Sequence, residues 1–72
     1  MTRTALSKLN EKQLEHLRKM SVAIARVRDC EDEYDKELFD YRTGGLHGYL
    51  KCLADMDIIT ESEKNLLFAY FK

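Results

Sequence analysis

The chain contains no proline, and all three of its glycines lie between residues 44 and 48. Proline and glycine are the residues that most disfavour a regular helix, so the stretches 1–43 and 49–72 are free to be helical throughout. Of the 72 residues, 44% are apolar and 35% are charged, which suits neither a disordered chain nor a membrane-spanning one. The sequence therefore predicts an all-α fold with a single helical domain over 1–72.

Apolar side chains recur three and four positions apart through the first half of the chain. The series runs through Leu17, Met20, Ile24, Val27, Glu31, Tyr34, Leu38 and Tyr41, of which only Glu31 is charged. Such heptad spacing, preceded by the capping pair Asn10 and Gln13, predicts one long helix over about 8–41, roughly 50 Å in length at 1.5 Å per residue. A break near Asp29, with that residue capping a new helix, stays open as the alternative and gives four shorter helices.

The remaining residues predict a short helical hairpin at the C-terminus. Thr43 is a good N-cap, so a turn over 42–45 is expected to lead into a second helix over about 44–57. The motif Thr60–Glu63 has the pattern of a capping box with acidic residues in the first turn. It predicts a third helix over about 61–71.

The lengths of these helices predict a homodimer. Helices of roughly 20 Å and 16 Å cannot cover an apolar seam of roughly 50 Å. Side chains left bare on the seam form a patch of the kind that monomers avoid, so we expect a second copy to cover it in a coiled-coil-like helical bundle. The predicted dimer interface consists of Leu14, Leu17, Met20, Ile24, Val27, Tyr34, Leu38 and Tyr41.

Charge divides the predicted long helix into two halves. Seven basic and two acidic side chains give 1–28 a net charge of +5, and seven acidic and one basic give 29–40 a net charge of −6. An antiparallel pair centred on Asp29 sets the basic half of one copy along the acidic half of the other, whereas a parallel pair sets like charges together. The sequence therefore favours the antiparallel orientation.

Two features are candidates for contact with another protein. The acidic run can occupy a basic groove on a partner, as a phosphate backbone does, and tyrosine and arginine, which dominate interface hot spots, gather around the glycines. The candidate partner-binding residues are Tyr41, Arg42, His47, Tyr49, Asp32 and Glu33. The favoured function is a small, non-catalytic protein-interaction or regulatory module of the adaptor or inhibitor type.

A basic stripe on the first helix gives the alternative function, a small dimeric DNA- or RNA-associated regulator. The candidate contacts to phosphate are Lys12, Arg18, Lys19 and Arg26. The net charge of −1 and the lack of aromatic residues between these positions make this the weaker hypothesis.

No motif points to catalysis or to metal binding. Cys30, Cys52, His16 and His47 match no zinc-binding spacing, and no nucleophile is accompanied by a base and an orienting group. We therefore expect no catalytic residues, no cofactor and no metal. The lack of an apolar leader predicts a cytoplasmic protein with reduced thiols and no membrane partner.

Overall fold

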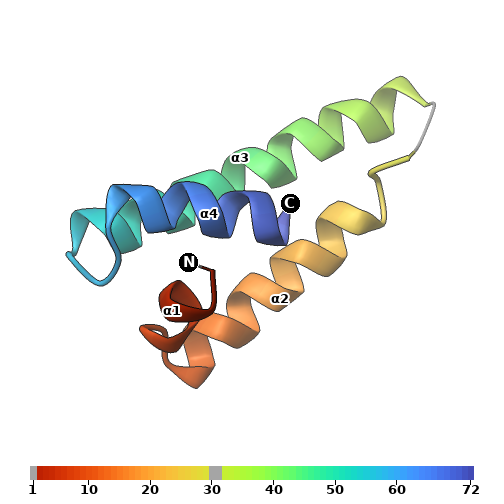
Figure 1. The fold of residues 1–72 in the computed structure, drawn as a ribbon. Helices are drawn as coiled ribbons and strands as arrows, with labels where there is room; N and C mark the ends of the chain where they lie inside the picture. The colour runs from red at the N-terminus through yellow and green to blue at the C-terminus, as the bar shows by residue number, and fades with distance from the viewer. Residues whose placement is uncertain (1, 30–31) are drawn as a thin grey trace.

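The computed structural model describes residues 2–29 and 32–72, and the regular elements in this part of the chain are all helices. They are α1 (Thr2–Ser7), α2 (Glu11–Ala25), α3 (Glu33–Asp55) and α4 (Glu61–Phe71). Figure 1 shows α2 and α3 as two long antiparallel helices, with α4 alongside the second half of α3 and α1 packed against α4. The predicted all-α class is confirmed.

The predicted continuous helix over 8–41 is wrong, because the chain reverses direction between α2 and α3. α2 ends at Ala25, and α3 begins after Asp32, whose carboxylate accepts a hydrogen bond from the Tyr34 backbone N–H at 2.9 Å. The alternative of a break near Asp29 is closer to the structure, although Asp32 is the residue that caps the new helix.

The acidic run gives the physical reason for this break. Glu33 and Asp35 lie in the first turn of α3, where the helix dipole stabilises negative charge. In one continuous helix the same carboxylates would lie mid-helix without that stabilisation. Cys30 and Glu31, the charged member of the predicted seam, lie outside the described residues.

The predicted turn over 42–45 is also wrong, because α3 continues through all three glycines. None of them has a positive φ, and the Thr43 hydroxyl donates to the Asp40 carbonyl oxygen at 3.0 Å instead of capping a helix. A glycine inside a helix costs about 1 kcal/mol relative to alanine. The burial of Leu46 and Leu50 on the inner face of α3 outweighs this cost, at about 1.5–3 kcal/mol for each side chain.

Both predicted capping boxes are confirmed. The Asn10 side chain accepts from the Gln13 N–H at 2.8 Å, and the Thr60 hydroxyl accepts from the Glu63 N–H at 3.1 Å. The first box starts α2, and the second starts α4 at the predicted residue. The short helix α1, which precedes the first box, was not predicted from the sequence.

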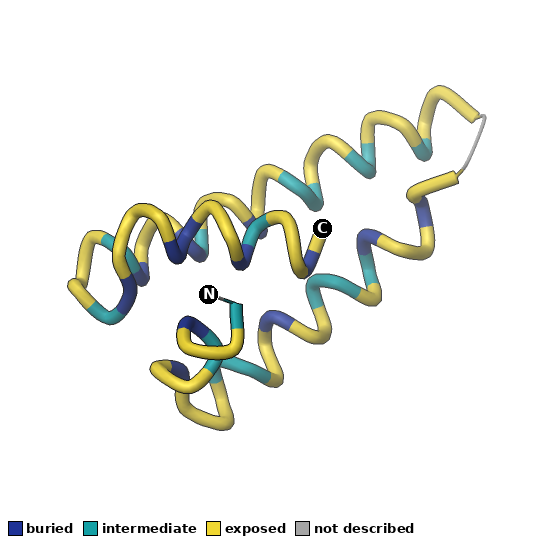
Figure 2. Tube along the Cα trace, in the orientation of Figure 1, coloured by how far each residue is buried: buried dark blue, intermediate teal, exposed yellow. Residues whose placement is uncertain are grey.

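The core lies where α2, α3 and α4 meet, and Figure 2 shows the buried segments gathered there. Its completely buried large side chains are Leu17, Ile24, Leu46, Leu50 and Leu67. Because Leu17 and Ile24 pack inside their own chain, the structure lacks the uncovered seam on which the predicted coiled-coil dimer depends.

Candidate functional site

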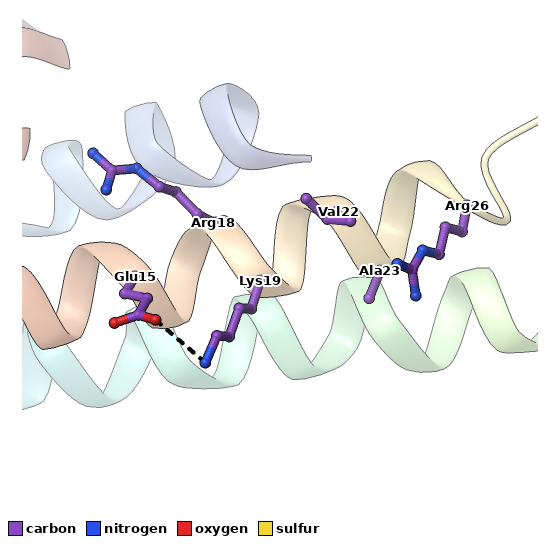
Figure 3. Close-up of a pocket in the computed structure, with 6 residues that line it drawn as sticks. All are labelled: Glu15, Arg18, Lys19, Val22, Ala23 and Arg26. Carbon is purple, nitrogen blue, oxygen red and sulfur yellow. Dashed lines mark ion pairs between the residues drawn. The ribbon is translucent and has the colours of Figure 1, made fainter.

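The outer side of the α2–α3 pair carries two adjoining hollows. The first, of about 430 Å³, is shown in Figure 3 and is lined by Glu15, Arg18, Lys19, Val22, Ala23 and Arg26. The second, of about 190 Å³, is lined by Met20, Ala23, Tyr41, Arg42 and Gly45. Ala23 lines both hollows, so they adjoin, and we call the surface that contains them the α2–α3 face.

The helical period of α2 places the residues of the first hollow. Leu17 and Ile24 point into the core, and residues about half a turn away, such as Lys19 and Arg26, must therefore point outward. Figure 3 shows Lys19 and Glu15 joined by an ion pair on this outer side, with Nζ and Oε1 3.4 Å apart. Both side chains are exposed, so this ion pair adds little to the stability of the fold.

Apolar groups interrupt the charged rim of the face. Tyr41 is 80% exposed and Val22 is 52% exposed, which makes them two of the more exposed large apolar side chains in the described chain. The second hollow between α2 and α3 is lined by the apolar parts of its five residues. The face therefore combines exposed apolar side chains with basic ones.

Arg42 fixes the relation of the two helices beneath the face. Its Nη1 donates a hydrogen bond to the Ala23 carbonyl oxygen at 2.5 Å. That carbonyl belongs to the last turn of α2, where backbone acceptors lack partners within the helix and positive charge is favoured. Arg42, predicted as a partner contact, therefore has a structural role here.

The structure separates the residues that were predicted to cluster on a turn. His47 packs edge-to-face on Phe68 of α4, with ring centroids 5.6 Å apart, and Tyr49 lies 4.5 Å from the ring of His16. Burial, and then the nearby Cys52, raise the pKa of Tyr49. Of the predicted set, Tyr41 is the residue whose ring is left largely exposed on the α2–α3 face.

The predicted acidic contacts, Asp32 and Glu33, are exposed but serve the start of α3 as its N-cap and first-turn residue. The predicted phosphate contacts lie together on α2: three of them line the first hollow, and Lys12 is exposed on the same helix.

The eight residues of the predicted dimer interface divide into three groups. Leu17, Ile24 and Val27 are buried, and Tyr34 and Tyr41 are exposed. The half-buried remainder is Leu14, Met20 and Leu38. Val22, Ala23 and Gly45, which line the hollows, were not predicted from the sequence. The recurrence of basic residues every seven positions does mark the side of α2 on which the first hollow lies.

Two kinds of site were sought among the described residues, a metal-binding cluster and a membrane-spanning helix. Within 2–29 and 32–72 no three His, Cys, Asp or Glu side chains gather in a way that could hold a metal. Among these residues, no helix has the length and apolar character needed to cross a membrane. Comparison with known protein families, with curated proteins and with solved structures finds no match to this chain.

Proposed function

We propose that the chain is a small, non-catalytic interaction module that binds another protein through the α2–α3 face. The observation that carries this proposal is the pair of adjoining hollows in which exposed Val22 and Tyr41 lie beside basic side chains. An apolar centre with a polar rim is the usual anatomy of a protein interface, and tyrosine and arginine are enriched among its strongest contacts.

The charge of the rim indicates what the partner presents. Arg18, Lys19 and Arg26 surround the first hollow, and Glu15 is its one acidic member. Such a surface complements an acidic segment with one apolar side, most simply an amphipathic helix laid along the groove. An adaptor or an inhibitor can act by this kind of docking without catalysis.

The test is affinity capture of binding proteins with a variant of the face as bait. Tyr41→Ser combined with Val22→Ser removes the two most exposed large apolar side chains of the face. Both positions are exposed enough for the fold to tolerate the change. Tyr70→Ser is the matched control, since Tyr70 is 60% exposed on α4, away from this face. We expect the double variant to lose proteins that the wild type and the control retain. Equal capture by all three baits would refute the proposal.

Nucleic acid is the second candidate, because three of the basic residues gather around one hollow and Lys12 extends their stripe. Binding of this kind depends on phosphate contacts and weakens steeply as salt rises. Nuclease treatment of the captured material separates the two functions: material held through nucleic acid is released, and a protein bound to the face is retained.

A further inference from the structure

We propose that the partner of the α2–α3 face is a second copy of this chain, paired so that α2 of each copy lies along α3 of the other. This inference rests on the proposed function, because it uses the same face. The result is an antiparallel four-helix bundle with a two-fold axis parallel to the helices. Each copy offers the same surface to the other, as the symmetry of a homodimer requires.

Each helix of the face presents an outward stripe with helical spacing of three and four residues. The stripe on α2 consists of Lys12, Glu15, Lys19, Ala23 and Arg26. The stripe on α3 consists of Tyr34, Leu38, Tyr41, Gly45, Gly48 and Cys52. The first is mainly charged and the second is apolar or small, so the aliphatic stems of the Lys and Arg side chains can cover the apolar stripe of the other copy while their charged ends stay at its edge.

The chain's own hairpin fixes which residues lie at the same level. The His16 ring lies beside that of Tyr49, and the Ala23 carbonyl accepts a hydrogen bond from Arg42. Seven residues forward along α2, from 16 to 23, therefore correspond to seven residues back along α3, from 49 to 42. Residues paired in this way lie at the same height along the bundle axis. A two-fold axis parallel to the helices keeps these levels and exchanges the helices. Ala23 of one copy is therefore placed opposite Tyr41 and Arg42 of the second copy.

When α2 of one copy lies along α3 of the other, oppositely charged residues of the two copies come within about two residues of the same height along the bundle axis. Lys12 lies near the level of Asp55 of the second copy. Arg26 likewise lies near the level of Glu37 of the second copy. Glu37 and Asp55 are both exposed, and the helical period places them beside the outward stripe of α3. Symmetry makes each pair occur twice, which selects the orientation of the two copies.

The other symmetric way to cover the face sets α2 against α2 and α3 against α3. That pairing places the stripe containing Lys12, Lys19 and Arg26 against an identical stripe, so like charges face one another. The exchanged pairing avoids this repulsion. It also sets Lys19 across from Gly45 and Gly48, where the glycines leave room for its long side chain.

The glycines fit this arrangement and have no other use inside the described chain. A Cβ added at Gly45 or Gly48 would meet no atom within 4 Å, and neither residue has a positive φ. The fold of one copy therefore does not require them. Close approach of a second copy's helix gives a reason for small residues at the middle of the outward stripe.

Disulfide mapping distinguishes the two pairings. In chains with Cys30 and Cys52 replaced by Ser, Ala23→Cys chains are mixed with Tyr41→Cys chains, refolded together and oxidised. We expect mainly the mixed 23–41 disulfide, because the exchanged pairing sets these positions opposite each other while identical positions lie diagonally apart, beyond the ~7 Å Cα limit for a bridge. Preferential 23–23 or 41–41 bridges would overturn the proposed pairing.

Charge exchange tests the pairing without cysteines. Lys12→Glu or Asp55→Lys should each raise the dissociation constant of the dimer by roughly tenfold, since each weakened pair occurs twice. The double exchange should restore the affinity, and Lys36→Glu, the same charge change on the other side of α3, should leave it unaltered. Additive losses in the double variant would contradict the pairing.

Failure of this inference is distinguishable from failure of the proposed function. Light scattering should give twice the chain mass of 8.5 kDa at high concentration. A monomer at every concentration, with capture of another protein that still depends on Tyr41 and Val22, overturns the homodimer and leaves the interaction module standing. A monomer whose capture is unaffected by the face variant overturns both.

Discussion

The two ends of the molecule are built differently. At the packed end (residues 2–19 and 46–72), α1, α4 and the second half of α3 enclose most of the buried side chains. In the arm (residues 20–29 and 32–45), no residue of the α3 side is buried, and Tyr34 and Tyr41 are 67% and 80% exposed. The packed end is stable through its own contacts, whereas the arm leaves apolar surface that a partner can cover.

The packed end also contains an ion pair between residues far apart in the sequence. Lys8 Nζ lies 2.8 Å from Glu63 Oε1, which also accepts the Thr60 backbone N–H at 2.7 Å. This one carboxylate therefore ties the link after α1 to the start of α4. In the arm, arginine side chains donate hydrogen bonds to backbone carbonyl oxygens of other elements, among them the bond from Arg42 to Ala23. From this difference we infer that α1 and the link after it belong to the packed end and not to the α2–α3 face.

The largest expected effect is on packing. Leu50→Ala at the packed end should lower the free energy of unfolding by about 2–5 kcal/mol, because it leaves a cavity among completely buried neighbours. Leu38→Ala in the arm should cost clearly less, because Leu38 is only half-buried. Urea denaturation of dilute protein measures both values. Equal losses would show that the arm is packed as tightly as the other end.

A smaller effect of opposite sign is expected at the glycines of α3. Gly48→Ala should raise the free energy of unfolding of the dilute chain by about 1 kcal/mol, since alanine favours the helix and the added methyl group meets no atom. The same change should weaken self-association, because the methyl group enters the proposed interface. Thermal melts at low concentration and sedimentation at high concentration measure the two effects. Stronger association would argue that no helix approaches Gly48.

Loss of the N-cap of α4 should weaken the packed end alone. Thr60→Ala removes the hydroxyl that accepts the Glu63 N–H and should cost about 1 kcal/mol. Amide exchange should accelerate in α4 and α1 while the arm keeps its rates. Uniform acceleration over all helices would indicate that the two ends unfold as one unit.

The smallest expected effect is on the pH dependence of stability. The hydrogen bond from Lys8, followed by that from the Thr60 backbone, holds the pKa of Glu63 below its usual value of about 4.3. A lowered carboxyl pKa stabilises the fold above the usual value, and this contribution is lost as the pH falls through the pKa of the folded state.

Urea midpoints measured from neutral pH downward should therefore fall more steeply in the wild type than in Glu63→Gln. Glu61, whose pKa is lowered mainly by a hydrogen bond from Lys64, supports a similar loss in both proteins and does not obscure the difference. Parallel curves for the wild type and the variant would contradict the role given to Glu63.

The sequence predicted those structural features that depend on residues close together in the chain. The capping boxes at Asn10 and Thr60 gave the starts of α2 and α4, since each depends on side chains three residues apart. The reversal between α2 and α3 was harder to predict, because heptad spacing is the same for one long helix and for two helices that fold back on each other. The continuity of α3 through its glycines depends on tertiary burial of Leu46 and Leu50, which no local signal contains.

The site was predictable only in part for the same reason. The recurrence of Lys12, Lys19 and Arg26 marks a stripe on α2 from sequence alone. That Tyr41 lies next to this stripe follows from the hairpin between α2 and α3, which the predicted long helix excluded. The tyrosine and the basic residues were therefore assigned to separate functions, although the structure brings them to one face.

The central claim is that the α2–α3 face binds and that α1 and α4 do not, and amide chemical shifts across a dilution series test it most directly. Between the millimolar and micromolar range, the amides of Val22, Ala23, Tyr41 and Gly45 should shift together along one binding curve. The amides of Ala5 and Leu67, buried at the packed end, should stay in place. Shifts concentrated on α1 and α4, with the face unchanged, would contradict the account.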